Sequence, residues 1–470
     1  MKVAVLGIDG LYPAFFQDFA PELPVFSELK RKGSLNVLHS TIPPFTPQAW
    51  TTMLTGANPG THGIAGFVLK LNGERKPVDR TDIQVPSLIE HFADQGVRVG
   101  VLNVPLSYPA PPWATFAVSG MLTPGVNAPG FTQPPDLAAK LLSAVPAYVI
   151  DVAVQKHHLE DRTVWARLEA MAEARLQAAR FLLRSFQVDL FFVVFVVLDR
   201  FCHLAFRYFC GKDPLAGSPR AERLRRLFSG IMRGIDAFAG ELCEKFDSVL
   251  VVSDHGFRPE IGKFYLPLFL EKNGLFKPIP SLKRKVADLA VAVLGRSLLR
   301  RLLPSGFLSR ELARNAPRPG PGSRAWPSEL AAQGVWCPDP AQQDRLRELL
   351  SELRHPRSGE PLLTGIWKRD ELYRGPCVQR FPHLVLELLH GGIEVSPHAI
   401  GRRALHLSPS DWPGGHHDRH GVALVYSQDA RVKPKHEAWD MVDVVPSLCS
   451  LMGIKAPPWA EGSSRIQTCG

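Results

Sequence analysis

The sequence predicts an α/β fold: a doubly wound, mostly parallel central sheet flanked by helices, with an inserted cap region. Three observations predict it. Apolar runs rich in β-branched residues recur along the chain, helical patterns alternate with them, and one Arg- and Pro-rich stretch interrupts the alternation. Continuously apolar strands are typical of a sheet covered on both faces, as parallel sheets are, and alternation with helices is typical of doubly wound folds. The 470 residues suffice for a large core.

Six runs are expected to form strands: Val3–Ile8, Arg98–Val104, Asp189–Val197, Ser248–Ser253, His383–Leu388 and Val422–Ser427. Helical patterns cover Ser87–Gln95, Pro135–Ser143, Thr163–Ser185, Ala221–Lys245, Pro340–Leu353 and Met441–Met452. The longest apolar run, Leu190–Leu198, is far shorter than the roughly 20 residues of a membrane-spanning helix, so we expect a buried strand there.

The alternation stops between residues 265 and 377, where stretches such as "RNAPRPGPGSRAWP" are loop-like. We therefore expect a first part of the α/β core at 1–264, a basic, Pro/Arg-rich insertion or cap at 265–377, and a second part of the core at 378–470. Most of the net charge of +10 belongs to residues 281–330, which hold ten Lys and Arg against three Asp and Glu. Within them, 283–303 combines a helical apolar stripe with basic flanks.

Segment 283–303 has three alternative interpretations: a cap helix with a solvated basic face, a helix that contacts anionic lipid, or a clamp for a polyanionic substrate. The seven cysteines show no paired spacing, which favours free thiols in a reducing compartment. The apolar start of the chain is too short for a secretory signal and is interrupted by Asp9. We expect a cytoplasmic protein, with peripheral membrane contact through 283–303 as an option and no specific nucleic-acid partner. No feature indicates an oligomeric state.

Carboxylates and imidazoles follow three of the predicted strands. In an open α/β sheet, ligands bind beyond the carboxyl ends of the strands, so these side chains are expected at one edge. Each pattern alone is more typical of a hydrogen-bonded loop or a helix face, but their convergence favours a metal site. Oxygen and nitrogen ligands without thiolate suit zinc, manganese or iron, and the mixture favours zinc. The residues are Asp9 in "GIDG", Asp199 and His203 in "LDRFCH", and Asp254 and His255 in "SDHGF".

A late histidine cluster is a further source of ligands. His416, His417 and His420 directly precede the last predicted strand. We expect at least two of the three to be solvated.

Thr46 has two interpretations. Pro47 suits the first position of a helix, which would make Thr46 its N-cap. Alternatively, the partial positive charge of the helix N-terminus and a neighbouring metal ion would lower the pKa of the hydroxyl and make Thr46 a nucleophile.

Several motifs together resemble the alkaline phosphatase superfamily, and in particular its type I phosphodiesterase/nucleotide pyrophosphatase branch. The resemblance runs from Val3 to about Gly462. It implies an alkaline-phosphatase-like fold and a metal-dependent hydrolase of phosphoric ester bonds that uses two divalent ions, zinc or alternatively manganese. The motifs are "GIDG", "TPQAWTTMLTGANPGTHGI", "NVPLSYPAPP", "LDRFCH", "SDHGF", "GGHH" and "DVVPSLCSLMGIKAPPWAEG".

The resemblance also implies roles for individual residues. Thr46 matches the nucleophile that forms a phospho-threonine intermediate. By the family pattern, one metal ion would be held by Asp9, Thr46, Asp254 and His255, and the other by Asp199, His203 and His417, with His416 as the alternative. The substrate would be a small-molecule or lipid-linked phosphoester.

The chain departs from the family shortly after His-Gly-Ile, where nucleotide pyrophosphatases usually carry an asparagine and this chain reads Ala65-Gly66-Phe67. Nucleotide specificity is therefore not implied. A phosphodiesterase is the leading interpretation. A phosphomonoesterase, phosphonate hydrolase or phospho-group transferase on the same site is the first alternative, and a catalytically silent basic binding protein is the second.

Overall fold

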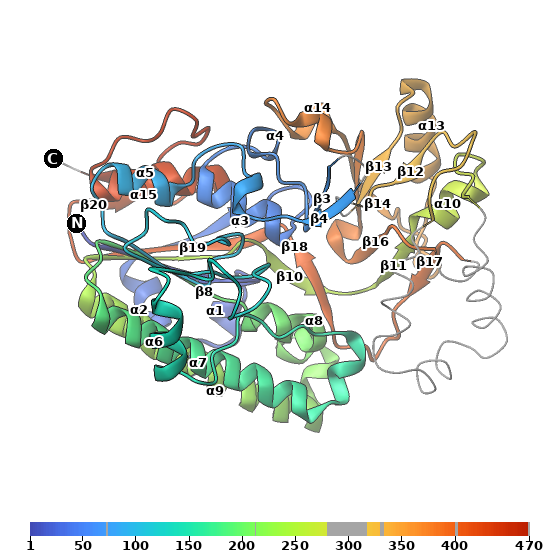
Figure 1. Ribbon diagram of the computed structural model, residues 1–470. Helices are drawn as coiled ribbons and strands as arrows, with labels where there is room; N and C mark the ends of the chain where they lie inside the picture. The colour runs from blue at the N-terminus through green and yellow to red at the C-terminus, as the bar shows by residue number, and fades with distance from the viewer. Residues whose placement is uncertain (72–73, 212, 280–316, 330–332, 400–402, 469–470) are drawn as a thin grey trace. The chain divides into compact units, whose positions relative to one another are not determined.

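The computed structural model describes residues 1–71, 74–211, 213–279, 317–329, 333–399 and 403–468 (Figure 1). The chain divides into two compact units. The first comprises 1–258, 373–378 and 413–470, and the second comprises 259–372 and 379–412. All the predicted site residues belong to the first unit, while segment 283–303 lies outside the described residues.

The first unit is built on a nine-stranded sheet with the order β21-β2-β19-β9-β1-β8-β5-β6-β7. Its centre consists of the parallel strands β9 (Ser248–Val252), β1 (Val3–Ile8), β8 (Leu190–Phe195) and β5 (Val99–Leu102). Every residue of these strands is buried, which explains why their sequences are continuously apolar. The predicted mostly parallel α/β sheet is confirmed.

Antiparallel pairing is confined to the outer strands. β19 (His420–Ser427) runs antiparallel to both β9 and β2 (Ser34–His39), and β6 (Phe116–Val118) pairs antiparallel with β7 (Thr132–Gln133). β21 (Trp439–Asp440) lies at the edge, parallel to β2. The last predicted core strand is thus present, but its direction is opposite to that of the central strands.

Helices cover both faces of this sheet. In Figure 1, α7 and α9 lie on one side, and α3, α5 and α15 lie on the other. The helices of the unit are α1 (Phe15–Asp18), α2 (Pro24–Lys32), α3 (Thr46–Thr55), α4 (Pro59–His62), α5 (Leu88–Asp94), α6 (Leu137–Ala144), α7 (Arg162–Ser185), α8 (Val197–Phe209), α9 (Pro219–Lys245) and α15 (Val444–Met452). Three small pairs complete it: β3 (Val68–Leu71) with β4 (Glu74–Pro77), β10 (Gly256–Pro259) with β18 (Gly415–Asp418), and β20 (Val432–Pro434) with β22 (Ile466–Thr468).

The second unit has its own sheet and its own apolar core. Its strands are β11 (Gly262–Tyr265), β12 (Trp326–Pro327), β13 (Gly334–Trp336), β14 (Leu363–Lys368), β15 (Leu384–Leu388), β16 (Ile393–Ser396) and β17 (Leu405–Leu407), and its helices are α10 (Leu266–Lys272), α13 (Pro340–Ser351) and α14 (Arg369–Leu372).

One strand expected in the central sheet belongs to this second sheet. The predicted run His383–Leu388 forms β15, which pairs antiparallel with β13 and β14. A continuously apolar run indicates that a strand is covered on both faces, but it does not indicate the sheet to which the strand belongs.

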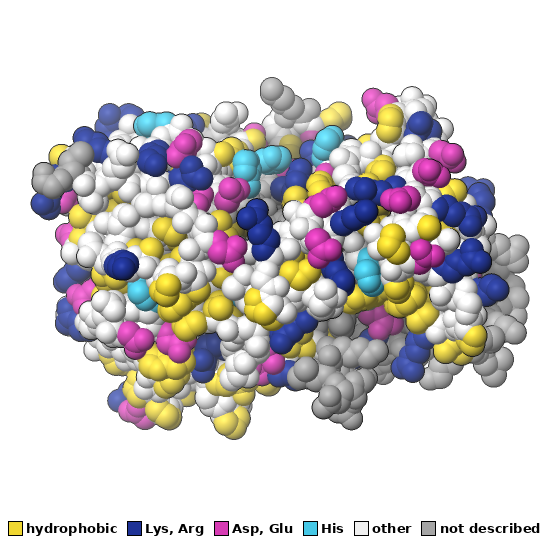
Figure 2. Space-filling model, turned by 90° about the horizontal axis from the view of Figure 1, so that it is seen from above, with side chains coloured by type: hydrophobic (Ala, Val, Ile, Leu, Met, Phe, Trp, Pro, Cys, Tyr) yellow, Lys and Arg dark blue, Asp and Glu magenta, His cyan; other side chains and the backbone are white. Residues whose placement is uncertain are grey.

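Among the described residues, no helix is both long enough and apolar enough to cross a bilayer. On the face of the molecule that Figure 2 shows, Lys and Arg side chains are interspersed with Asp and Glu. Most of the basic excess of residues 281–330 lies outside the described part of the chain.

Candidate metal centre

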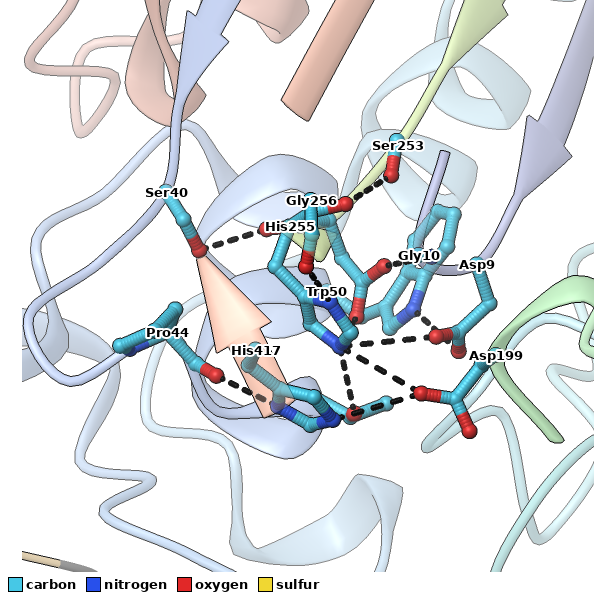
Figure 3. Close-up of polar contacts among 12 residues, drawn as sticks. Asp9, Gly10, Ser40, Pro44, Trp50, Asp199, Ser253, His255, Gly256 and His417 are labelled. Carbon is cyan, nitrogen blue, oxygen red and sulfur yellow. Dashed lines mark hydrogen bonds and ion pairs between the residues drawn. The ribbon is translucent and has the colours of Figure 1, made fainter. Parts of the chain in front are cut away.

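Three strands and their neighbours bring the predicted carboxylates together. Asp9 follows β1 and Asp254 follows β9, and the parallel register pairs Gly7 with Val252, so both aspartates leave the sheet at the same level. His255 comes next in the chain, just before β10. His417 lies on β18, the partner strand of β10, and its ring stacks on that of His255 at 3.6 Å between centroids (Figure 3).

Asp199 and His203 share one face of a helix, as their spacing predicts. Strand β8 ends at Phe195, two residues earlier than expected, and the chain enters α8 at Val197. Asp199 therefore lies in the first helical turn, with its Oδ1 atom 3.3 Å from His203 Nε2 one turn later.

Thr46 is not the N-cap that the sequence predicted. Helix α3 begins at Thr46 itself, the N-cap is Phe45, and no side chain caps the helix. Pro47 consequently occupies the second helical position, which is tolerated because the amides of the first turn have no intrahelical partners. Since the Thr46 hydroxyl is not used as a cap, it is available to the cluster: Oγ1 lies 3.3 Å from His255 Nε2.

The imidazole of His255 faces three carboxylates. Its Nε2 atom is 3.6 Å from Asp9 Oδ1 and 4.0 Å from Asp199 Oδ1 (Figure 3). The same atom is 3.3 Å from Asp254 Oδ2. His417 Nε2 lies 3.3 Å from Asp199 Oδ1, the same carboxylate oxygen, and 3.0 Å from His203 Nε2. Asp199 Oδ1 thus lies between two overlapping groups of ligand atoms.

Backbone carbonyls fix the tautomers of two of these histidines. His255 Nδ1 is 3.1 Å from Gly256 O, and His417 Nδ1 is 2.9 Å from Pro44 O (Figure 3). A carbonyl only accepts, so Nδ1 must donate in both cases. Burial lowers the pKa of both histidines, well below its usual value for His255, which keeps the rings neutral. Each Nε2 atom therefore presents a lone pair to the cluster.

Each of the three aspartates has one oxygen held by the protein and one left free. Trp50 Nε1 donates to Asp9 Oδ2 at 3.3 Å, the Gly10 amide donates to Asp254 Oδ1 at 3.3 Å, and Arg200 donates to Asp199 Oδ2. The other oxygens lack a hydrogen-bond partner among the described residues; they are Asp9 Oδ1, Asp199 Oδ1 and Asp254 Oδ2. All three carboxyl groups are buried.

Burial and mutual repulsion raise the pKa of Asp9 and of Asp254 well above the usual value. Burial acts on Asp199 in the same direction, yet His203 and Arg200 beside it hold its pKa well below the usual value. Buried carboxylate oxygens and imidazole lone pairs that face one another repel unless a cation lies between them.

The ligand atoms fit divalent cations. Asp199, His203 and His417 form one group whose ligand atoms lie within 4.8 Å of one another, and Asp9, Asp199 and His255 form another. Of the three late histidines, His417 alone belongs to these groups, which are drawn from the described residues; His420 is exposed and its Nδ1 atom lies 2.6 Å from Asp418 Oδ1. Histidine and carboxylate donors are of the types that bind divalent metal ions in proteins.

Two residues beside the cluster were missed by the sequence reasoning. Trp50 is four residues after Thr46, so the helical period already places it on the face of α3 that carries Thr46. Arg200 directly follows Asp199, but a charge next to a ligand has no local pattern that marks it as a partner of that ligand.

The fold and this cluster define an α/β protein with a buried group of candidate metal ligands beside a helix N-terminus. The chain belongs to the Type I phosphodiesterase / nucleotide pyrophosphatase family, whose sequence profile matches residues 3–388. The predicted class of protein, a hydrolase acting on phosphoric ester bonds, is thereby confirmed. A search of curated protein sequences gives no significant match.

Solved structures share the fold at low sequence identity. Phosphonoacetate hydrolase from Sinorhizobium meliloti 1021, in complex with phosphonoformate, is 17% identical with a TM-score of 0.53, covering 94% of this chain and 93% of that one. Murine ectonucleotide pyrophosphatase/phosphodiesterase 5 is 14% identical with a TM-score of 0.51 and 98% of each chain covered. A mutant of the alkaline phosphatase PafA is 13% identical with a TM-score of 0.51, covering 98% and 97%. The predicted alkaline-phosphatase-like fold is confirmed.

Proposed function

We propose that the protein is a phosphodiesterase-like hydrolase that uses two divalent metal ions and a phospho-threonine intermediate on Thr46. One observation carries the proposal: buried aspartates with free oxygens and histidines with Nε2 lone pairs form one cluster, and the Thr46 hydroxyl lies 3.3 Å from the Nε2 atom of its member His255. By ligand type, the ions are zinc, with manganese as the alternative. The proposed first set is Asp9, Thr46, Asp254 and His255, and the proposed second set is Asp199, His203 and His417.

When bound, a pair of divalent cations neutralises charge on the transferring phosphoryl group and lowers the pKa of a hydroxyl beside it. Thr46 Oγ1 attacks phosphorus in line with the leaving oxygen. The bond from Oγ1 to phosphorus forms, the bond from phosphorus to the leaving oxygen breaks, the threonine hydroxyl gives up its proton to solvent, and the leaving alcohol takes up a proton from solvent. Water then hydrolyses the phospho-threonine, which releases phosphate or a phosphomonoester and restores the hydroxyl. The N-terminus of α3 favours the negative charge of the phosphoryl group, although Pro47 lacks an amide hydrogen there.

The proposed substrate is a small-molecule or lipid-linked phosphoester. A phosphomonoesterase, a phosphonate hydrolase or a phospho-group transferase would use the same metal ligands. Because the fold is similar to that of a phosphonoacetate hydrolase, the experiment below includes a phosphonate substrate. The stretch Ala65-Gly66-Phe67 after His-Gly-Ile contains no asparagine, which supports a substrate other than a nucleotide. The proposal also includes a cytoplasmic location, with peripheral membrane contact through 283–303 as an option.

The test replaces the nucleophile. Thr46→Ala protein, reconstituted with Zn²⁺ or Mn²⁺, should lose turnover of bis-(p-nitrophenyl) phosphate by about a thousandfold or more, because the covalent route is removed. Thr51→Ala is a matched control, since Thr51 lies in the same helix and its hydroxyl bonds only locally, to Pro47 O. Mass spectrometry of acid-quenched wild-type protein should find phosphate on the peptide that contains Thr46.

Three results would contradict the proposal in different ways. Wild-type turnover by the Thr46→Ala protein would show that Thr46 is not the nucleophile. Faster turnover of p-nitrophenyl phosphate or phosphonoacetate than of the diester would favour the alternative hydrolases. If the reconstituted wild-type protein bound no metal ion and hydrolysed none of these substrates, the catalytically silent alternative would hold.

A further inference from the structure

Arg200 lies between two carboxylates, one inside the metal cluster and one outside it. Its Nη1 atom donates to Asp199 Oδ2. Its Nε and Nη2 atoms donate to the two oxygens of Asp151, at 3.0 and 2.6 Å. A guanidinium stays protonated in proteins, so Arg200 places a positive charge beside the cluster.

The two carboxylates contact different parts of the guanidinium. The Nε/Nη2 edge is a fork that matches the two oxygens of one carboxylate, and Asp151 occupies that fork. Asp199 receives a hydrogen bond from the remaining Nη1 atom at one oxygen. Its other oxygen, Oδ1, faces His203 and His417 and has no hydrogen-bond partner among the described residues.

The position of Asp151 is itself fixed by the fold. Arg175, only 2% exposed, donates from Nη2 to Val149 O at 3.0 Å and to Ile150 O at 2.9 Å, and its guanidinium lies over the Tyr148 ring. Asp151 Oδ1 also accepts from the amide of the next residue at 2.7 Å. The loop that carries Asp151 is therefore anchored to α7 through Arg175, independently of its contact with Arg200.

We propose that Asp151 is a positioning residue for the metal centre: by occupying the fork of Arg200, it confines Arg200 to one oxygen of Asp199 and keeps Oδ1 available to a cation. This inference rests on the proposed function only in that the cluster binds metal. Without the Asp151 carboxylate, the fork of Arg200 is free to turn onto Asp199 and pair with both of its oxygens, because a bidentate pair between two buried charges is stronger than a single contact. Arg200 then competes with the cation for Asp199.

The experiment is a calorimetric titration of metal-stripped protein with Zn²⁺, repeated with Mn²⁺. In Asp151→Asn, the affinity of one of the two sites should fall about 10- to 100-fold, the usual range for loss of a residue that orients a ligand. Excess metal should restore kcat, since the variant lowers occupancy and leaves the reacting groups in place.

Asp189→Asn is the matched control. Asp189 also accepts a fork from an arginine, Arg98, but it precedes β8 and therefore lies at the opposite end of that strand from Asp199. This variant should bind both ions as wild type does.

A double variant separates competition from a general structural role. An Arg200→Gln background has no guanidinium that could turn onto Asp199. If Asp151 acts by restraining Arg200, then Asp151→Asn should change metal affinity by no more than about threefold in that background. The same background keeps the test informative if Asp151→Asn alone fails to fold, because the double variant has no unpaired buried guanidinium.

Two outcomes would overturn the inference: unchanged metal affinity in Asp151→Asn, or an equal loss in the Arg200→Gln background. Both are independent of turnover. If wild-type protein binds two ions and Asp151→Asn binds them equally well, the inference fails while the proposed function stands. If wild-type protein binds none, the proposed function fails first.

Discussion

His62, in the His-Gly-Ile motif, is fully buried and uses both ring nitrogens within the fold. Its Nδ1 atom accepts from the Ile64 amide at 3.2 Å. Its Nε2 atom lies 2.9 Å from Thr52 Oγ1, whose own hydrogen is donated to Gln48 O. Nε2 is therefore the protonated nitrogen of a neutral ring, and a second proton on Nδ1 would face the Ile64 N–H. Accordingly, burial lowers the pKa of His62 to about 3.

This histidine should make the protein less stable in acid. Below about pH 6.5, the usual pKa of a histidine, His62 is protonated in the unfolded chain, whereas in the folded protein it stays neutral down to about pH 3. The free energy of unfolding should therefore decrease as the pH falls through that window, by about 1.4 kcal/mol per pH unit from this residue. Urea unfolding at about pH 7.5 and pH 5 measures this dependence. In His62→Gln, the slope of the unfolding free energy against pH should be smaller by the equivalent of one bound proton.

Thr52→Val is the control for this prediction. It removes the hydroxyl bonded to His62 but keeps the imidazole, so it should lower stability at both pH values and leave most of the pH slope in place. An identical slope in wild type and His62→Gln would mean that His62 is protonated in the folded protein.

At the scale of residues, the sequence identified candidate ligands that lie together in the structure, but not the residues that hold them in place. Asp9, Asp199 and His255 could be predicted because each follows an apolar strand, and strand ends in a parallel sheet share an edge. Asp151 follows no strand and no motif, and its link to Asp199 exists only through the folded loop. Partners of this kind depend on tertiary contacts, so a local pattern contains no signal for them.

At the scale of elements, β1 and α3 approach each other closely at a glycine. A β-carbon added to Gly7 would lie 2.7 Å from Trp50 Cη2 and 2.9 Å from Val194 Cγ2. The indole that would be displaced is the one that donates to Asp9. The missing side chain thus allows the helix with Thr46 to lie against the strand that leads to Asp9.

Gly7→Ala should therefore destabilise the protein, although alanine is the better strand residue by about 0.5–1 kcal/mol. Overpacking of a buried site typically costs about 1–3 kcal/mol, so the steric effect should prevail. The indole fluorescence of Trp50 should also change, because its packing and its hydrogen bond are disturbed. Gly125→Ala, with no atom within 4 Å of the added carbon, is the matched control. A stabilised Gly7→Ala protein would contradict the close approach.

Two predictions about helices and strands were wrong: the sheet to which β15 belongs and the first residue of α3. The i, i+4 spacing of Asp199 and His203 is a local property, and it places both side chains on one face of α8. The run that forms β15 was assigned to the wrong sheet, and the start of α3 was placed one residue too late. Sheet membership is decided by contacts far along the chain, and the first turn of a helix tolerates proline at more than one position.

At the scale of the whole molecule, the candidate ligands come from sequence positions between Asp9 and His417, yet all belong to the first unit. Bound cations would link β1, α8, β18 and the end of β9. Without them, the free oxygens of Asp9, Asp199 and Asp254 repel one another. A ligand that binds only the folded state adds about 4 kcal/mol of stability at a concentration a thousandfold above its Kd. Chelation should therefore lower the melting temperature.

The loss should be uneven across the chain. After chelation, amide hydrogen exchange should increase around Gly10, Thr46, Asp199 and Gly256, because those segments lose the charges that hold them together. β14 and β15 in the second unit contain no candidate ligand and have their own core, so their exchange should stay unchanged under native conditions. Re-addition of Zn²⁺ should restore protection. Equal loss of protection in both units, or none in either, would show that the cations do not act through this cluster.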